Sequence, residues 1–130
     1  MTDPIADMLN RIRNAQAVLH PSVDVPYSNF KYSLAEIFLK QGVIKKIEKK
    51  HNKTRKIIRI TLKYKDNQPI ISHLERISKP GRRVYASSKR IRLSRGGGGF
   101  IIVSTPKGLM IGWEARKQNL GGEIIAEIWQ

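Results

Sequence analysis

Two short apolar runs near the C-terminus constrain the fold of this chain more than any other feature. Phe100–Val103 and Ile124–Ala126 have the length and composition of buried strands. The segment Ser104–Gly108 follows the first run, and residues 113–118 are then rich in helix formers. This order predicts a strand, a polar loop, a short helical pattern that ends at Asn119 with Gly121 as its stop signal, and a final strand.

The loop Ser104–Gly108 carries groups that suit a polar, anionic partner. Ser104 and Thr105 supply hydroxyls, Lys107 supplies a cation and Gly108 supplies flexibility, all beside a rigid strand. An ordinary strand–helix connection with polar residues is the alternative, and this stretch alone favours neither interpretation.

The charge of the chain is strongly positive and spread over its whole length. There are 25 Lys and Arg residues against 10 Asp and Glu residues, for a formal net charge of +15. Residues 1–70 contribute +8 and residues 71–130 contribute +7. Such a charge favours nucleic acid or an anionic membrane surface as the partner. The apolar runs are too short to span a membrane and the N-terminus does not resemble a signal peptide, so we expect a nucleic-acid partner, no membrane partner and a cytoplasmic location.

Residues 1–68 predict a helix, a strand, a second helix and two further strands. Asp3-Pro4 suits the start of the first helix, and Ser28 and Gly42 suit the start and end of the second. The alternating segment Val23–Val25 predicts a short strand between the helices. The helical spacing of four apolar residues predicts the core-facing side of the first helix: Ile5, Met8, Leu9 and Ile12.

Three polar residues of these helices are candidate nucleic-acid contacts. Arg13 and Asn14 fall off the apolar face of the first helix, and a solvated helix face is the alternative. Lys31 lies in the first turn of the second helix, where a cation opposes the helix dipole, which points to a role outside the helix.

The segment 45–59 contains eight cations and only one acid. Asn52 suggests a hairpin turn, with Lys53 and Arg55 beside it as candidate phosphate contacts. Lysines that protect an edge strand from aggregation are the alternative, although eight cations exceed that need.

A second basic segment, 79–95, contains seven cations and no acid, and Lys79, Arg82 and Arg83 are its candidate contacts. Pro80-Gly81 predicts a turn. Tyr85 follows the arginines and suits either stacking on a base or a place at the edge of the core. The polar break at residues 66–69 divides the chain into predicted domains 1–68 and 69–130.

Catalytic patterns are sparse. The run Gly96–Gly99 precedes a strand, whereas a phosphate-binding loop opens a helix and continues with Lys and Ser or Thr, so a nucleotide-handling enzyme is the weaker hypothesis. There is no Cys and the three His are dispersed, so we expect no metal site and no cofactor. Glu123 suits a carboxylate that orients the Ser104–Gly108 loop or accepts from a 2′-hydroxyl or base amine, and a water-exposed turn residue is the alternative.

Five motifs in register resemble the bacterial small-subunit ribosomal protein S-eight family. They cover essentially the whole chain, at residues 1–15, Ser78–Tyr85, Ser104–Gly108, Glu114–Lys117 and Gly121–Glu123.

The resemblance implies an α+β fold of two small α/β domains and a structural role in the small ribosomal subunit, without enzymatic activity; an organellar ribosome is the alternative location. It implies binding to the central domain of 16S rRNA at a helix with an irregular internal region, and RNA contacts at Ser104, Thr105, Lys107, Gly108 and Glu123. Ribosomal proteins S-five and S-twelve are implied neighbours, and some family members repress their own operon by binding its mRNA.

Three departures from the family pattern affect the details of the site. Pro106 replaces a serine of the loop and removes a hydroxyl and a backbone donor. Ile111-Gly112-Trp113 replaces a segment with an acidic helix cap, and the glycine run is longer than usual.

Overall fold

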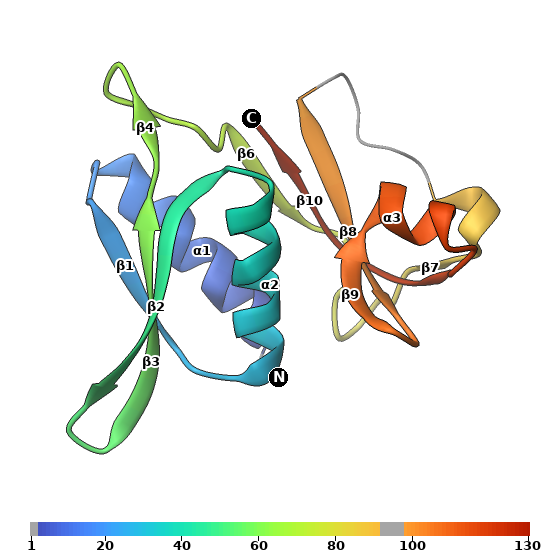
Figure 1. Cartoon of the computed structure of the whole chain (residues 1–130), viewed down its shortest axis with the longest axis horizontal. Helices are drawn as coiled ribbons and strands as arrows, with labels where there is room; N and C mark the ends of the chain where they lie inside the picture. Colours follow the sequence, from blue (N-terminus) through green and yellow to red (C-terminus); the bar gives the residue numbers. More distant parts are fainter. Residues whose placement is uncertain (1–2, 92–97) are drawn as a thin grey trace. The chain divides into compact units, whose positions relative to one another are not determined.

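The computed structural model describes residues 3–91 and 98–130 (Figure 1). The contacts within the chain form two compact units, one of residues 4–71 and one of residues 72–130 with Asp3. Helices and antiparallel strands occur in both units, which confirms the predicted α+β class. The domain boundary at residues 68–69 stays a prediction.

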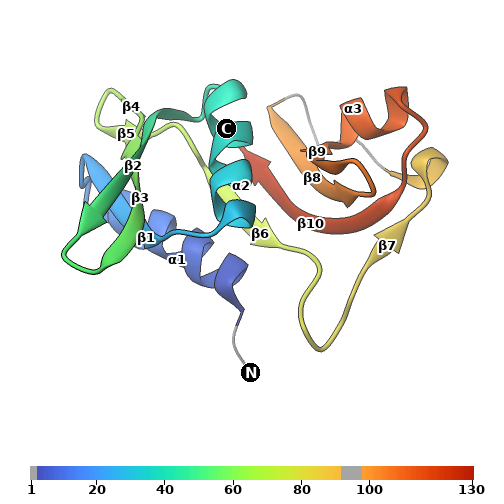
Figure 2. The same cartoon turned by 60° about the horizontal axis from the view of Figure 1, so that its bottom comes forward.

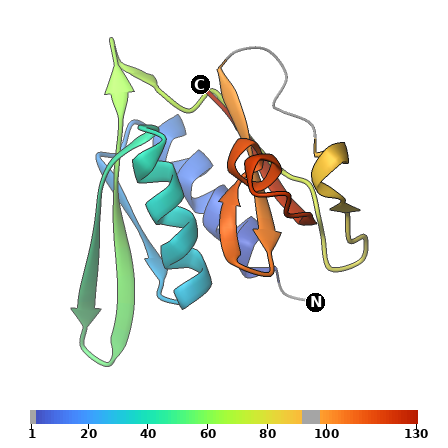
Figure 3. The same cartoon turned by 45° about the vertical axis from the view of Figure 1, so that its right-hand side comes forward.

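The first unit has a three-stranded antiparallel sheet, in the order β1-β3-β2, and both long helices lie on one face of it (Figures 1 and 3). A two-stranded sheet of β4 and β5 follows in the chain. The elements of the first unit are α1 (Pro4–Ala17), β1 (Ser22–Pro26), α2 (Asn29–Lys40), β2 (Ile44–Asn52), β3 (Arg55–Leu62), β4 (Tyr64–Lys65) and β5 (Gln68–Pro69).

The core of this unit comes from the apolar faces that the sequence periodicity predicts. Met8, Leu9 and Ile12 of α1 are fully buried, whereas Ile5 is half-buried. The buried partners from the other elements include Leu34, Phe38, Ile58 and Ile60. Because a helix and a strand each hide only one face, the opposite faces stay available for charged residues.

The predicted limits of α2 are confirmed. The Ser28 side chain accepts a hydrogen bond from the Lys31 backbone N at 3.1 Å, as an N-cap does. At the other end Gln41 is the C-cap, and Gly42 follows with a φ of +76°, which glycine adopts without strain.

The second unit is built on a sheet in the order β6-β10-β8-β9, with β7 also paired to β10. Figure 2 shows β10 as a long curved strand with β7 beside its start and β6 beside its end. The elements of the second unit are β6 (His73–Arg76), β7 (Tyr85–Ala86), the 3-10 helix η1 (Ser88–Arg90), β8 (Gly99–Thr105), β9 (Gly108–Ile111), α3 (Gly112–Lys117) and β10 (Gly122–Trp129).

The structure adds a strand that the sequence pattern did not predict. Thr105–Gly108 is a tight turn of a β-hairpin between β8 and β9, with Pro106 and Lys107 at its tip. The polar loop therefore returns the chain along β8 before α3 begins.

The residue that stops α3 is also different from the predicted stop signal, although the helical pattern ends near Asn119 as predicted. Asn119, with a φ of +57°, is the left-handed residue after the helix, and Gly121 is not the stop. The Asn119 N donates to Arg116 O at 3.1 Å and the Leu120 N donates to Ala115 O at 2.8 Å, the bonds of a Schellman end. Asparagine adopts this conformation more readily than most residues because its short polar side chain can form local hydrogen bonds.

The two glycines instead allow close packing of backbones. A Cβ on Gly122 would lie 2.0 Å from the Ser104 carbonyl oxygen, and a Cβ on Gly121 would lie 2.6 Å from that of Ala86. Neither contact is possible for a real side chain, so the start of β10 can only lie this close to β7 and β8 because both positions are glycine.

Gly96, Gly97, Arg92 and Arg95 lie outside the described residues. Gly99 opens β8, so this part of the glycine run leads into a strand, as predicted.

Candidate nucleic-acid interface

Three polar side chains form a row across neighbouring strands of the second unit. Ser104 of β8 pairs with Glu123 of β10, and Glu123 in turn pairs with Tyr85 of β7. Residues that lie directly opposite in adjacent strands project from the same face of a sheet. The structure thus brings together a hydroxyl, a carboxylate and an aromatic ring that are far apart in the sequence. We call these three residues the polar row.

The other face of the same strands is apolar. Val103 and Ile124, the neighbours of Ser104 and Glu123, belong to a buried cluster with Ile91, Ile101 and Ala115. Because side chains alternate along a strand, burying Val103 and Ile124 directs Ser104 and Glu123 away from this core. The hydrophobic pattern of β8 and β10 therefore fixes which polar groups are presented.

Glu123 is held by two partners. Ser78 is fully buried, and its hydroxyl donates a hydrogen bond to Glu123 Oε2 while accepting one from the Val84 N at 3.2 Å. Arg83 Nη1 donates to the same carboxylate oxygen at 3.0 Å. Partial burial raises the pKa of Glu123, but the bonds from Ser78 and Arg83 outweigh it, so the pKa lies below its usual value. The carboxylate is thus ionised and fixed in direction.

Thr105 holds the hairpin turn together, and a contact between Thr105 and RNA stays a prediction. Its side chain is only 9% exposed, its hydroxyl donates to Gly108 O at 2.8 Å, and it accepts from the Lys107 N at 3.1 Å. Thr105 therefore closes the hairpin turn from within. Ser104 and Thr105 are consecutive strand residues, so their hydroxyls project from opposite faces and only Ser104 joins the polar row.

The turn itself presents its tip to solvent. Pro106, Lys107 and Gly108 are all exposed. Gly108 has a φ of +114°, a conformation that residues with a Cβ rarely adopt. A rigid turn with an exposed lysine at its tip is suited to contact an anionic partner.

Three of the predicted contacts in segment 79–95, Lys79, Arg82 and Arg83, lie within a few positions of Tyr85 in the sequence. Lys79 and Arg82 exchange two backbone hydrogen bonds, of 3.0 and 2.9 Å, around the predicted Pro80-Gly81 turn. Arg83 contacts Glu123, and Tyr85 is 69% exposed. Exposure of the Tyr85 ring favours the stacking interpretation over a place at the edge of the core.

The remaining candidates belong to the first unit. Arg13 and Asn14 are exposed on α1, and Arg13 Nη1 donates to Asn10 Oδ1 at 2.6 Å. Lys53 and Arg55 are exposed at the β2–β3 hairpin, where Lys53 adopts a φ of +57° in the turn next to Asn52.

Lys31 does not project outward as expected. Its side chain is 7% exposed, and burial is the main cause that lowers the pKa of its ammonium group, with the Asp7 carboxylate opposing the shift. A contact between Lys31 and RNA stays a prediction that this burial disfavours.

Sequence reasoning missed two residues of the second unit. Ser78, which fixes Glu123, has no local signal, because its importance comes from a partner 45 residues away. Trp113 is 55% exposed, and Lys117 Nζ lies 5.1 Å from the centroid of its ring. An exposed tryptophan in a basic chain is itself a signal that points to a binding surface.

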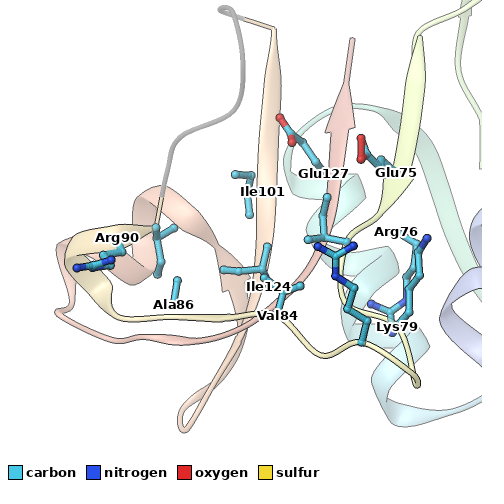
Figure 4. Close-up of a pocket in the computed structure, with 12 residues that line it drawn as sticks. Glu75, Arg76, Lys79, Val84, Ala86, Arg90, Ile101, Ile124 and Glu127 are labelled. Atoms are coloured by element: carbon cyan, nitrogen blue, oxygen red, sulfur yellow. The ribbon is translucent and has the colours of Figure 1, made fainter.

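A pocket of about 460 Å³ lies in the second unit, with Arg90 at one end and Arg76 and Lys79 at the other (Figure 4). Its floor is apolar and includes Ile101 and Ile124. The described residues that line it include no Ser, Thr, Cys or His, so they supply neither a hydroxyl or thiol nucleophile nor an imidazole base. Within residues 3–91 and 98–130, no group of three or more His, Cys, Asp or Glu could hold a metal ion.

Among the described helices, none is both long and apolar enough to cross a membrane.

The exposed cations, the polar row and the exposed hairpin tip have the chemistry of a nucleic-acid-binding protein. Comparison with known proteins gives the family. The family model of Ribosomal protein S8 matches residues 3–129. The chain belongs to this family and is a structural ribosomal protein, which confirms the resemblance and the prediction that it is not an enzyme.

Its relatives match over nearly their whole length. The chain is 53% identical to the small ribosomal subunit protein uS8 of Lachnoclostridium phytofermentans, over 99% of this chain and 98% of that protein. It is 51% identical to uS8 of a Thermoanaerobacter species and 49% identical to uS8 of Vesicomyosocius okutanii, with the same coverage.

Proposed function

We propose that this protein is a component of the small ribosomal subunit that binds the central domain of 16S rRNA directly and helps to assemble the platform of the subunit. Its target is a helix with an irregular internal region. The family and the names of its relatives support a place in the small subunit.

The observation that carries the proposal is the polar row. Ser104, Glu123 and Tyr85 lie side by side in register on one face of a sheet. The exposed turn that carries Lys107 follows Ser104 directly in the sequence. Regular A-form RNA hides its base edges in a deep, narrow groove, so proteins recognise 2′-hydroxyls, unstacked bases and shape. A hydroxyl and a carboxylate can hydrogen-bond to 2′-hydroxyls and base edges, and an exposed ring can stack on an unstacked base. A regular duplex exposes few of these groups, so we expect it to bind the polar row only weakly.

Each member of the row has a distinct expected contact. The Ser104 hydroxyl has no hydrogen-bond partner among the described residues and can donate to or accept from a 2′-hydroxyl or a base edge. The Glu123 carboxylate accepts only, so it selects a 2′-hydroxyl or a base amine and repels a phosphate. The Tyr85 ring can stack on a base that has left the helix.

The cations supply affinity without sequence preference. Lys79, Arg82 and Lys107 in the second unit and Lys53 and Arg55 in the first are suited to neutralise phosphates. Gly108 lets the turn come close to the RNA backbone because it lacks a side chain. Thr105 supports the turn from within.

Two further parts of the proposal concern other partners. Ribosomal proteins S-five and S-twelve are its expected neighbours in the subunit. An mRNA of its own operon that repeats the irregular helix would bind the same surface and allow repression.

Crosslinking in cells tests the target. We expect ultraviolet crosslinks from the protein to concentrate in one irregular helix of the central domain of 16S rRNA, with Tyr85 among the crosslinked residues. Crosslinks to its own operon transcript would support repression. Crosslinks spread evenly over rRNA, tRNA and mRNA would contradict the proposal.

A further inference from the structure

The two oxygens of the Glu123 carboxylate have different surroundings. Both partners of this side chain bind the same oxygen: the Ser78 hydroxyl and Arg83 Nη1 donate to Oε2, the latter at 3.0 Å. No described residue donates a hydrogen bond to Oε1. The Glu123 side chain is 19% exposed, so it is held at the surface of the unit.

Glu123 Oε1 is accessible to solvent. Within residues 3–91 and 98–130, the one buried side-chain nitrogen or oxygen that lacks a hydrogen bond is Arg76 Nε, outside fully exposed residues. Because Oε1 also lacks a hydrogen bond and is not such an atom, it is not buried. The carboxylate therefore has one oxygen that the protein holds and one oxygen that a partner can reach.

The two groups that hold Oε2 both require an acceptor there. Ser78 is fully buried, and its oxygen accepts a hydrogen bond from the Val84 N at 3.2 Å, which leaves its single proton for Glu123. The guanidinium of Arg83 contains only donors. A proton on Oε2 would face both of these donors, so a proton that binds the carboxylate is directed to Oε1.

Protonation of Oε1 changes what the protein presents. An ionised carboxylate oxygen only accepts hydrogen bonds, whereas a protonated one presents an O–H donor. A proton and a hydrogen-bond donor of RNA therefore compete for the same atom.

The charges around Glu123 favour the ionised form. Partial burial raises the pKa of Glu123, but the two bonds to Oε2 and the charges of Arg83 and Arg76 hold this pKa below its ordinary value. The residues opposite Glu123 in β7 and β8 are Tyr85 and Ser104, which are uncharged at neutral pH. Oε1 is therefore an acceptor at neutral pH.

We propose that Ser78 and Arg83 are positioning residues that determine specificity, because they hold Glu123 so that Oε1 accepts a hydrogen bond from one RNA donor, a 2′-hydroxyl or a base amine. Arg83 acts through the carboxylate, since its Nη1 is already bonded to Oε2. Acid weakens recognition, because a proton on Oε1 replaces the acceptor with a donor. The inference rests on the proposed function in taking the polar row as the surface that recognises RNA.

Glu123→Gln tests which atom is presented. Ser78 and Arg83 both donate, so they are expected to hold the amide oxygen and to leave the NH2 group in the place of Oε1, as a donor. The probe is the irregular central-domain helix of 16S rRNA. We expect binding at neutral pH to weaken about tenfold, as loss of one hydrogen bond to a charged group predicts. Unchanged affinity for this helix would overturn the presentation of Oε1.

The pH dependence of binding separates positioning from charge. Arg83→Gln removes a donor and a cation from Glu123, so its carboxylate is expected to take up a proton at higher pH. Relative to the original protein, we expect this variant to bind the irregular helix about threefold more weakly at about pH 5 than at about pH 7.5.

Arg82→Gln is the charge-matched control, because it removes a neighbouring cation that makes no bond to Glu123 among the described residues. Its loss of affinity relative to the original protein is expected to be the same at both pH values. If Arg83→Gln and Arg82→Gln depend on pH in the same way, Arg83 does not act through the carboxylate.

NMR titration of the Glu123 carboxyl carbon measures the positioning role without RNA. Ser78→Ala and Arg83→Gln are each expected to raise the pKa of Glu123, and Arg83→Lys, which keeps a cation and a donor, is expected to raise it less. Thermal melting shows whether each variant is folded. The two Arg83 variants still test the role if loss of the buried Ser78 hydroxyl prevents folding. A pKa that no folded variant changes would overturn it.

Modified RNAs distinguish the two kinds of donor. Single 2′-deoxy nucleotides in the irregular region remove 2′-hydroxyls, and purine in place of adenine removes a base amine. The modification that removes the donor should weaken binding to the original protein and have little effect on Glu123→Gln, because the two changes remove the same bond. If no modification of either kind behaves in this way, Oε1 does not bind an RNA donor.

The same measurements separate this inference from the proposed function. Failure of the original protein to prefer the irregular helix over a fully paired one would overturn the proposed function. A preference that Glu123→Gln and Arg83→Gln both retain in full, at neutral and acid pH, would overturn this inference alone.

Discussion

Ser104 lies directly opposite Glu123 across β8 and β10, while the backbone carbonyl of Ser104 is so close to Gly122 that a side chain there would lie 2.0 Å from it. A glycine thus sets the distance between the two strands that present the hydroxyl and the carboxylate. The recognition surface and the packing of the sheet depend on the same few atoms. Substitutions can therefore change the packing of β8 against β10 and the polar groups on these strands separately.

Gly122→Ala is expected to destabilise the protein severely, by about 3 kcal/mol or more, because the new methyl group would overlap backbone atoms that cannot move aside. Thermal or denaturant unfolding measures the effect. Gly81→Ala is the matched control, since nothing lies within 4 Å of a Cβ at that position. Similar stability of the two variants would contradict the close approach of β10 to β8.

Thr105→Ala is expected to lower stability by about 1–2 kcal/mol, because it removes the hydroxyl that bonds to Gly108 O and to the Lys107 N. Thr105→Ser retains the hydroxyl and should retain most of the stability. Denaturant unfolding compares the three proteins. An alanine variant as stable as the original but weak in RNA binding would mean that Thr105 contacts RNA and does not close the turn.

Glu123→Gln is expected to flatten the dependence of stability on pH in acid. The pKa of Glu123 is lower in the folded protein than its ordinary value of 4.5. Its stabilising contribution is therefore fully present above the unfolded-state pKa and is lost as the pH falls through the folded-state pKa. Between neutral pH and about pH 3, the original protein should lose more stability than the Gln variant. Parallel pH profiles in urea unfolding would show that Ser78 and Arg83 do not hold an ionised carboxylate.

Tyr85→Ala is expected to weaken binding of the irregular RNA by about 1–3 kcal/mol, the range for one base stacked on an aromatic ring. Tyr85→Phe keeps the ring and should restore binding, because stacking does not require the hydroxyl. Filter binding measures both. Equal loss for Phe and Ala would show that the tyrosine acts through its hydroxyl group.

Short sequence patterns predicted the helix face, the helix cap and the turn that depend on residues close together in the sequence. The spacing of Met8, Leu9 and Ile12 identified the buried face of α1, and the side chain of Ser28 caps α2 as expected. Pro80-Gly81 marked a turn that the structure contains. In each case the signal itself spans only a few positions: a helical spacing of apolar residues, a cap with the N–H that it bonds, or a turn dipeptide.

Features that depend on distant partners could not be predicted in this way. Whether Ser104 or Thr105 faces the polar row depends on the register of β8, and a shift of one residue exchanges the two hydroxyls. Glu123 is oriented by Ser78, 45 residues away. Gly121 was expected to end α3, but Asn119 does so, and the requirement for glycine comes from backbones of β7 and β8 that the local sequence does not contain.

The central claim is that the polar row recognises the irregular part of an RNA helix, and one measurement tests it most directly. The affinities of the protein and of Ser104→Ala are determined for the central-domain helix of 16S rRNA and for the same helix with its internal region replaced by Watson–Crick pairs. We expect the original protein to prefer the irregular helix, and Ser104→Ala to lose about 1–2 kcal/mol of that preference with little change in binding to the regular helix. If the variant discriminates between the two helices as well as the original protein does, the polar row does not read the irregular region.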